Sequence, residues 1–248
     1  MTEMDRQERL KLRESIRWPA LFVALIWMIH LVQVAFGWHW GQWLAIRPGY
    51  WESIGGVLFT PLLHANFLHL SSNSVSLFAL WAILLYFYPR VARRSFFLIY
   101  VLSGIGLWAW GFVPGTRGGY HIGASGVVYG LMAFLLGNGL FRRNVKSIII
   151  ALVVLFFYGG SIFMGLLPKE EVSHEGHWSG FIVGLFTSFF YKQEIEADEV
   201  ERRPSWEEEE EGPQAFFLPR DTFEKTKEQR RREAEGFSDW TSTSTGDY

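Results

Sequence analysis

The sequence has 248 residues, of which 49% are hydrophobic and 17% aromatic, and its formal net charge at pH 7 is −2. It contains no cysteine, which excludes a thiol nucleophile, a disulfide scaffold and a thiolate metal site. The apolar residues are concentrated between Trp18 and Tyr191, whereas the residues from Lys192 onward are polar and charged. A soluble domain intermixes the two kinds, so this segregation indicates a membrane protein with a solvated tail.

Six apolar segments follow one another along the chain, and a bilayer core of roughly 30 Å needs about 20 apolar helical residues. The segments are Trp18–Phe36, Phe67–Tyr88, Ser95–Val113, Gly123–Phe141, Ser147–Leu167 and His177–Tyr191. The last is short, so we expect its helix to begin before His177. The first has acids as well as bases before it and no A-x-A-like site after it, so we interpret it as a retained anchor. The pattern predicts an all-α membrane protein with six transmembrane helices.

Basic residues alternate between the two sides of these segments. Three connections are rich in them, namely the N-terminal flank (Arg6, Arg9, Lys11, Arg13, Arg17), the second connection (Arg90, Arg93, Arg94) and the fourth (Arg142, Arg143, Lys146). The other three loops hold one each, Arg47, Arg117 and Lys169. Short loops rich in Lys and Arg stay in the cytoplasm, so the pattern predicts that both termini are cytoplasmic.

The first external loop, Gly37–Asn66, is long and rich in aromatic residues. Its rings are Trp38, Trp40, Trp43, Tyr50 and Trp51. Such rings favour the membrane–water interface, where they act as an anchoring belt. A loop that lies partly in the membrane and covers a functional site fits the same pattern, and the sequence leaves both interpretations open.

Polar side chains inside spans are costly and tend to mark function. Three groups fall near the predicted outer ends of the second, fourth and sixth segments. They are His69 with Asn73, four residues apart on one helical face; Ser125; and the stretch "HEGHWSGFIVG" with His174 and His177. A serine hydrolase needs a nucleophile, a base and donors to an oxyanion, and these groups supply them at a similar depth.

Each group also has a structural interpretation. A small residue before a helix, such as Ser125, is often an N-cap. Gly180 and Gly184 form a helix-packing pair, which would let the sixth helix approach the fourth closely. His69 and Asn73 could join helices by hydrogen bonds. The "HEGH" string differs from the zinc motif H-E-x-x-H because its histidines are three apart, and no acidic residue elsewhere in the core offers a third ligand.

Three stretches together resemble the rhomboid intramembrane serine proteases, over about residues 55–190. "HANFLHLSSN" is similar to the family's H-x4-H-L-x2-N stretch in the second helix, and "GASGVVYGLMAF" to its G-x-S-G nucleophile motif, including a tyrosine four residues on. "HWSGFIVG" is similar to its H-x2-G-x3-G in the sixth helix. The sequence departs from many members where Trp51 is followed by Glu52 rather than arginine.

The resemblance implies a Ser–His dyad in which Ser125 is the nucleophile and His177 the general base. His69, Asn73 and the backbone N–H of Ser125 would stabilise the oxyanion. The supporting residues would be Tyr129, packed against the His177 ring, His64, which orders the first external loop, and the motif glycines Gly123, Gly126, Gly180 and Gly184. His174 competes with His177 for the role of base, but only His177 has the family's spacing to Gly180.

The resemblance further implies that the substrates are single-span membrane proteins in the lipid bilayer. We expect no cofactor, no metal and no nucleic-acid partner. We expect a bacterial inner-membrane protein whose active site opens to the extracytoplasmic side. An inactive relative that binds transmembrane helices is the alternative, although it would have lost the dyad. A transporter would place charged residues deep in the spans, where this sequence has almost none.

The expected organisation is a cytoplasmic segment 1–17, a rhomboid-like domain 18–191 and a cytoplasmic, largely disordered tail 192–248. The tail contains an acidic block at 207–211 and a basic stretch near its end. Its composition favours disorder with a short charged helix around 222–235. The sharper interpretation is that the "AFFLP" stretch at 215–219 docks to a partner or to the membrane.

Overall fold

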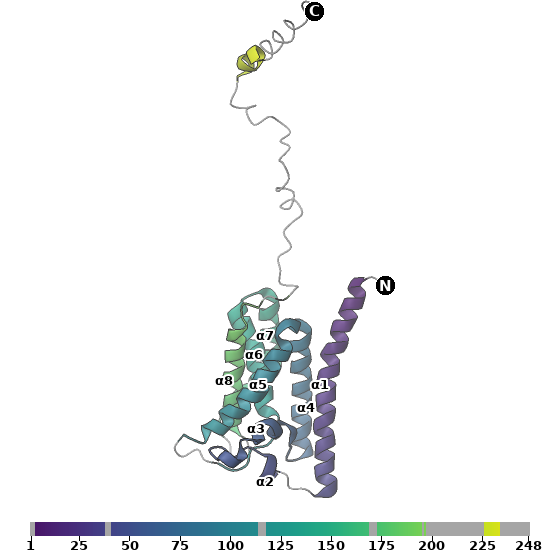
Figure 1. Ribbon diagram of the computed structural model, residues 1–248, viewed down its shortest axis with the longest axis vertical. Coiled ribbons are helices and arrows are strands. Elements are labelled where there is room, and N and C mark those ends of the chain that lie inside the picture. Colours follow the sequence, from purple (N-terminus) through teal and green to yellow (C-terminus); the bar gives the residue numbers. More distant parts are fainter. Residues whose placement is uncertain are drawn as a thin grey trace, which may run out of the picture. The chain divides into compact units, whose positions relative to one another are not determined.

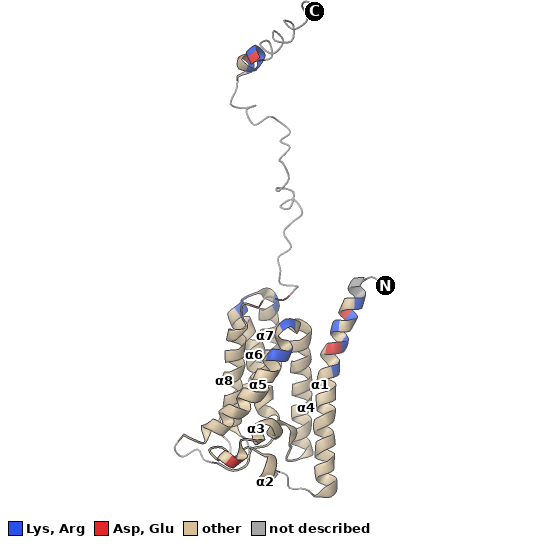
Figure 2. Cartoon of the chain, viewed as in Figure 1, with Lys and Arg blue, Asp and Glu red and all other residues tan. Residues whose placement is uncertain are grey.

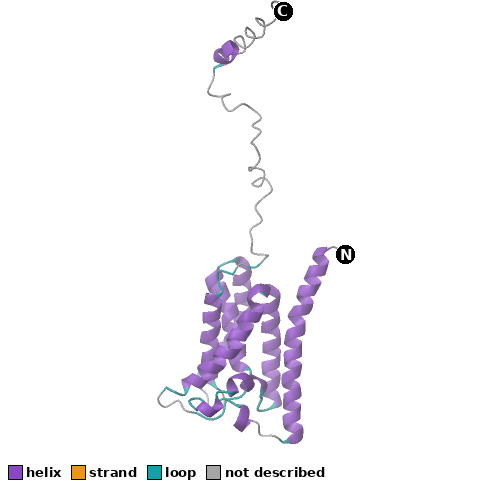
Figure 3. Ribbon diagram, viewed as in Figure 1, coloured by secondary structure: helices purple, strands orange, loops and turns teal. Residues whose placement is uncertain are grey.

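A computed structural model of the chain describes residues 3–37, 41–113, 118–168, 173–194, 196 and 226–233. Six long helices dominate these residues, and within them there is no strand, only an isolated bridge between Ile46 and His121 (Figure 3). The long helices are α1 (Glu3–Phe36), α4 (Phe67–Phe87), α5 (Pro89–Trp110), α6 (Ser125–Arg142), α7 (Val145–Leu166) and α8 (His174–Phe190). Four short helices lie between α1 and α4, namely α2 (Gly41–Leu44), η1 (Trp51–Ser53), α3 (Gly56–Phe59) and η2 (Thr60–Leu62).

The long helices coincide with the predicted apolar segments, and their starts follow local capping chemistry. The side chains of Asn66, Asn144 and Ser173 each accept a hydrogen bond from a backbone N–H in the first turn of α4, α7 and α8. Pro89 opens α5, where its missing N–H costs nothing. As expected, α8 begins before His177, at His174. The first helix extends further than the apolar segment because it continues N-terminally through the charged flank.

Four of the helices are long and apolar enough to cross a membrane, namely α1 over Arg6–Phe36, α4, α5 and α7. α6 and α8 are not among them, although six spans were predicted. α8 is short, with 17 residues. α6 is a continuous helix, but its sequence contains glycines and polar residues among the apolar ones, and several of these glycines pack closely against α8. The helices alternate in direction, so α6 begins at the end of the bundle where α1 finishes (Figure 1).

α6 forms the centre of the bundle. Residues 127–135 of this helix are all buried, and they pack against α4, α5, α7 and α8. Their apolar core includes Leu77, Leu80 and Leu84 from α4 together with Phe134 and Leu135 from α6. α1 lies on the outside against α4 (Figure 1). On α7 the large side chains of Phe156 and Phe157 point outward, as expected for a helix that faces lipid.

Charge separates the two ends of the bundle, as Figure 2 shows for Lys and Arg. Basic side chains gather where α5 starts and α6 ends, and Arg93 reaches Glu14 of α1 at 3.6 Å there. We call this the charged end and define it by Glu14, Arg90, Arg93, Arg94 and Arg142. The opposite end, where α6 starts, is called the Ser125 end.

The C-terminal part forms a separate unit, Glu201–Tyr248, while the compact first unit is Met1–Val200. In the second unit the structure describes a helix at 227–233, inside the predicted range of 222–235. Arg232 and Glu228 form an ion pair of 3.4 Å one turn apart on it. The acidic block at 207–211 and the "AFFLP" stretch lie outside the described residues, and the disorder predicted for the tail stays a prediction.

Candidate active site

Ser125 is the first residue of α6 and does not cap it. The N-cap is Ala124, and no side chain accepts a capping hydrogen bond there. The loop turns sharply just before, at Gly123, whose φ of +116° is a conformation that favours glycine. The structural interpretation of Ser125 as an N-cap is therefore wrong, and its hydroxyl is not engaged in holding the start of the helix.

The serine borders an open cavity at the Ser125 end. The cavity lies between the α1–α4 loop, α5, the loop before α6 and the start of α8. Its lining residues are Ile46, Thr60, Pro61, Ser103, Gly104, Leu107, His121, Ile122, Gly123, Ser125, Gly126, Val127, Ser173 and Gly176. A chain segment that entered this cavity would therefore meet Ser125 from α6 together with the first turn of α8.

His69 and Asn73 converge on the loop that leads to Ser125. Both lie on α4, one turn apart. A Cβ atom built on Gly123 would lie 2.7 Å from His69 Nε2 and 3.5 Å from Asn73 Nδ2, so only a glycine leaves room for them. Asn73 is buried, and its Nδ2 has no hydrogen-bond partner. A buried, unsatisfied donor is costly, and such groups call for an explanation such as a catalytic role.

His177 is buried on α8 and held by two contacts. Its Nδ1 lies 2.8 Å from the carbonyl oxygen of Gly165 on α7. A carbonyl only accepts, so the contact places the proton on Nδ1 and leaves the Nε2 lone pair of the neutral ring open. The Tyr129 ring stacks on the imidazole at 4.0 Å with an angle of 8° between the planes. Tyr129 lies one turn after Ser125, and its hydroxyl donates to the carbonyl of Ser161 at 2.6 Å.

The backbones of α6 and α8 touch, as the glycine spacing predicted. A Cβ atom on Gly180 would overlap the carbonyl oxygen of Gly126, and one on Gly184 would overlap that of Gly130. A Cβ on Gly126 would lie 3.2 Å from the carbonyl oxygen of Gly176. The glycines thus bring the turn that begins with Ser125 against the turn that carries His177. No hydrogen bond joins the Ser125 hydroxyl to His177 in the part of the chain that the structure describes.

His64 lies in the loop behind His69. It is buried, and its ring meets the His69 ring edge-on at 5.3 Å. Burial, together with the neighbouring His69 and His30, lowers the pKa of His64 to about 3, while the backbone of Leu62 opposes the shift. His64 is therefore neutral at physiological pH and supports the loop without adding charge next to His69.

Sequence reasoning missed two histidines near the site. His30 on α1 is buried and packs edge-on against Phe67 at 4.8 Å. His121 lines the cavity four residues before Ser125. Both could have been found, His30 as a polar residue in an apolar span and His121 from its place in the loop that opens the nucleophile motif.

His174 lies apart from the stacked pair. It is the first residue of α8, and its Nδ1 lies 3.5 Å from the Glu175 carboxylate, with 30% of its side chain exposed. Among the described residues, no three side chains of the metal-binding kinds gather closely enough to hold an ion.

The α1–α4 loop contributes Ile46, Thr60 and Pro61 to the wall of the cavity. Trp51 packs edge-on against Trp108 of α5 at 4.7 Å and so fixes the loop to the bundle, whereas Trp43 points outward with 85% of its surface exposed. The first two tryptophans of the predicted aromatic loop, Trp38 and Trp40, lie outside the described residues.

Comparison with known proteins identifies the family of the chain. The family model described as "Rhomboid domain" matches residues 47–194. The chain is 39% identical over 178 residues to "Uncharacterized protein Rv1337" of Mycobacterium tuberculosis, which covers 68% of this chain and 71% of the relative. It is 31% identical over 161 residues to "Putative rhomboid protease YdcA" of Bacillus subtilis, covering 63% and 75%. It is 28% identical over 136 residues to "RHOMBOID-like protein 5" of Arabidopsis thaliana, covering 51% and 40%.

The fold and the comparisons define a helical integral membrane protein with a rhomboid domain. The chain belongs to the rhomboid family, as its motifs predicted.

Proposed function

We propose that the chain is an intramembrane serine endopeptidase that cleaves single-span membrane proteins in or beside their transmembrane segments. The observation that carries this proposal is the environment of His177. Its ring stacks on Tyr129 one turn from Ser125, and its Nδ1 is occupied by the Gly165 carbonyl. A neutral imidazole oriented in this way is suited to accept a proton at Nε2.

In the proposed reaction, Ser125 Oγ attacks the scissile carbonyl while His177 Nε2 takes the hydroxyl proton. The oxyanion that forms accepts hydrogen bonds from Asn73 Nδ2, His69 and the backbone N–H of Ser125. The tetrahedral intermediate collapses to an acyl-enzyme, and His177 gives its proton to the leaving amine. A water molecule, deprotonated by His177, then attacks the acyl group and releases the second product with regeneration of Ser125.

The proposed setting in the membrane follows from charge and depth. All six long helices cross the bilayer, with the charged end in the cytoplasm, because short loops rich in Lys and Arg stay on that side. Both termini of the helical bundle are then cytoplasmic, in a bacterial inner membrane, and the cavity opens to the extracytoplasmic side, where water can enter. The glycines between α6 and α8 let these less apolar helices span while their backbones stay in contact.

The test is cleavage of a model single-span substrate by the full chain in proteoliposomes, together with labelling by a fluorophosphonate probe. We expect the wild type to cleave and to be labelled, and Ser125→Ala to lose both completely. His177→Ala should lose them as well, whereas His174→Ala should keep them. Residual cleavage by Ser125→Ala would overturn the assignment of the nucleophile. A wild type that binds the substrate without cleaving it or taking the label would favour an inactive, helix-binding relative.

A further inference from the structure

A second serine–histidine contact lines the same cavity, and the proposed reaction does not use it. His121 Nδ1 lies 2.6 Å from the hydroxyl of Ser173. Both residues belong to the cavity wall that also includes Ser125. The contact joins the loop before α6 to the first residue before α8, so it bridges the two segments that carry the proposed nucleophile and base.

The backbone of His121 is fixed to the α1–α4 loop. Its N–H donates to the carbonyl of Ile46 at 2.8 Å, and its carbonyl accepts from the Thr60 hydroxyl at 3.3 Å. The N–H of Gly123 donates to the carbonyl of Thr60 at 3.0 Å, and the Thr60 hydroxyl accepts from Ile46 N–H at 2.8 Å. Hydrogen bonds to Ile46 and Thr60 therefore fix the backbone from His121 to Gly123 against the α1–α4 loop. The His121 side chain makes its contact on the other side, with Ser173.

On the other side of the contact, Ser173 organises the first turn of α8. Its hydroxyl accepts from the N–H of Gly176 at 3.2 Å, and its carbonyl accepts from the N–H of His177 at 3.1 Å. A displacement of Ser173 would therefore move the turn that carries His177. His121 lies four residues before Ser125, and Ser173 lies four residues before His177. The hydrogen bond thus connects the two segments at positions that each precede a proposed catalytic residue by four residues.

We propose that His121 is a positioning residue, which holds the Ser125 loop and the first turn of α8 in register through its hydrogen bond to Ser173. The proposal rests on the proposed function. It assigns His121 no contact with the reacting atoms. Its effect on the reaction comes from geometry, because displacement of a reacting group by about 1 Å can cost about 10²-fold in rate.

The charges around His121 are consistent with a neutral ring. Burial lowers the pKa of His121, and His174 adds to this effect, while the carboxylate of Glu175 opposes it. Arg47 of the α1–α4 loop lies over the rings of Tyr50 and Tyr120, next to His121 in the chain. Since the Ser173 oxygen already accepts from Gly176, its hydroxyl hydrogen can be donated to a neutral His121 Nδ1.

The test compares full-length variants in proteoliposomes. His121→Leu removes the hydrogen bond, and His121→Asn restores a polar atom near the Nδ1 position without a titrating ring. Ser173→Ala removes the other partner, and the double variant completes a cycle. His174→Leu is the matched control, because this histidine neighbours Ser173 without a hydrogen bond to it among the described contacts.

We expect His121→Leu to lower kcat by about 10–100-fold with KM nearly unchanged, and to slow fluorophosphonate labelling in parallel. His121→Asn should recover most of the rate, and the double variant should be no slower than either single variant. The proposal would be overturned if the Leu and Asn variants lost equal amounts of activity, or if the effects in the double variant were additive. It would also be overturned if only KM or only thermal stability changed.

Hydrogen–deuterium exchange tests the effect of the His121–Ser173 hydrogen bond on the first turn of α8 without a measurement of activity. In His121→Leu, the amides of Gly176 and His177 should exchange faster than in the wild type, and in His121→Asn they should not. Unchanged exchange in the Leu variant would refute the link even in an active enzyme. If the wild type neither cleaves nor labels but exchange responds as expected, the proposed protease function fails and the structural link between the two segments stands.

Discussion

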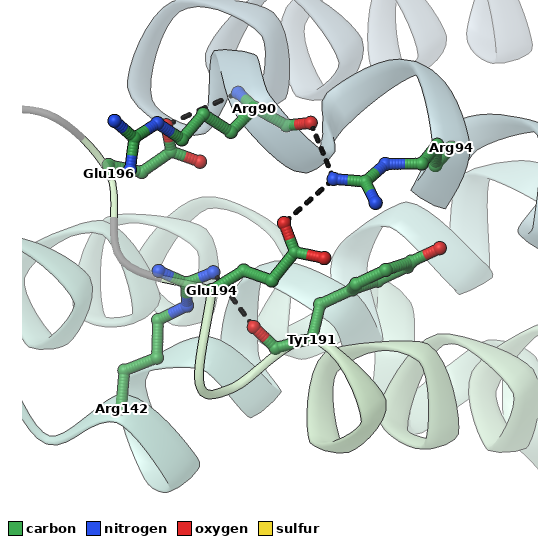
Figure 4. Close-up of polar contacts among 6 residues, drawn as sticks. All are labelled: Arg90, Arg94, Arg142, Tyr191, Glu194 and Glu196. Carbon is green, nitrogen blue, oxygen red and sulfur yellow. Dashed lines mark hydrogen bonds and ion pairs between the residues drawn. The ribbon is translucent and has the colours of Figure 1, made fainter.

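The two ends of the helical bundle handle polar groups in opposite ways. Around Ser125, Asn73 and His64 are buried and uncharged, and Asn73 Nδ2 has no partner among the described residues, although Arg47 and Glu175 also lie at this end. At the charged end the polar groups are ionised and paired with one another (Figure 4). Arg94 there lies between the carbonyl of Arg90 at 3.1 Å and the carboxylate of Glu194 at 2.7 Å.

Residues at the charged end also form hydrogen bonds to the residues that follow α8. The backbone N–H of Arg90, in the first turn of α5, donates to the buried carboxylate of Glu196 at 3.2 Å. Arg142, at the end of α6, donates to the carbonyl of Tyr191 at 3.1 Å. A carboxylate at a helix N-terminus is favoured by the helix dipole. Two acidic residues beyond the predicted start of the tail thus belong to the packed bundle.

This difference between the two ends predicts that one end contributes mainly to the stability of the fold and the other mainly to the proposed reaction. Arg94 and Glu194 at the charged end pair with each other, so removal of either should affect the stability of the fold. The reaction should not change, because the end of α6 at Arg142 lies 17 residues from Ser125. At the Ser125 end, Asn73 Nδ2 has no partner within the described residues, as the proposed oxyanion site requires of a preorganised donor. Substitutions at the two ends should therefore have distinct signatures, in activity at one end and in stability at the other.

Among variants that keep both Ser125 and His177, the largest effect is expected for Asn73→Ala, which removes a donor of the proposed oxyanion site. We expect kcat to fall by about 10²–10³-fold, the range for loss of one such donor. Thermal stability should change little, because Asn73 Nδ2 has no partner to lose. The measurement is substrate cleavage together with the melting temperature in the same detergent.

Asn138→Ala provides the control for Asn73→Ala. Asn138 is also buried, and its Nδ2 likewise has no partner among the described residues. It differs from Asn73 in position, 13 residues after Ser125 on α6, and its Oδ1 accepts a hydrogen bond from Ser188 at 2.9 Å. This variant should lose stability and keep its kcat. If both asparagine variants lost stability alike and neither lost activity, the contrast between the two ends would be refuted.

Next in size is the effect of Gly180→Ala. The new methyl group would overlap the carbonyl oxygen of Gly126, and the two helices would have to separate. Overpacking of this kind typically costs about 1–3 kcal/mol in the free energy of unfolding. Because the separation would also move His177 away from Ser125, activity should fall together with stability.

Gly160→Ala, on α7, is the matched substitution. A Cβ atom there meets nothing within 4 Å, so the alanine should add up to about 1 kcal/mol through helix propensity. Both variants are compared by thermal unfolding in detergent and by cleavage. Equal melting temperatures for the two variants would contradict the close contact of α6 and α8.

The third prediction concerns the pH dependence of stability. The pKa of His64 is about 3 in the folded chain, so below pH 6.5 the unfolded chain binds a proton that the folded chain does not. Stability therefore falls with decreasing pH, by about 2 kcal/mol from this group between pH 7 and pH 5. His64→Gln should remove that part of the slope, as measured by urea unfolding at the two pH values.

The effect of His64 on the pH dependence of the free energy of unfolding should vanish above pH 7, where His64 is neutral in the folded and the unfolded chain. Wild type and His64→Gln are therefore compared at pH 8 as well, where a constant difference in stability is expected. Identical slopes for the two proteins between pH 7 and pH 5 would show that the buried position of His64 is wrong.

The sequence predicted the all-helical fold and the rhomboid domain, because hydropathy and short motifs are local patterns. The catalytic roles of the site residues stay predictions. Hydropathy located the long helices, and the spacing of His69 with Asn73 and of Gly180 with Gly184 determined which side chains share a face. The contacts of Gly165 with His177 and of His121 with Ser173 could not be predicted. Each contact joins two separate segments of the chain through a single pair of atoms, and the periodicity of the sequence does not indicate such pairs.

The smallest effects are expected at the charged end, from Glu196→Gln and Glu194→Gln. Glu196 is buried against the first turn of α5, so its variant should lose the stabilisation of a charged helix cap, about 0.5–2 kcal/mol at most. Glu194 is partly exposed, and its pairing with Arg94 should contribute less and should weaken further in about 1 M salt, where the Debye length is about 3 Å. Melting temperatures at low and high salt distinguish the two variants, and kcat should stay at the wild-type value in both. A loss of cleavage in either variant without a loss of stability would show that the charged end is coupled to Ser125, and the separation of the two ends would no longer hold.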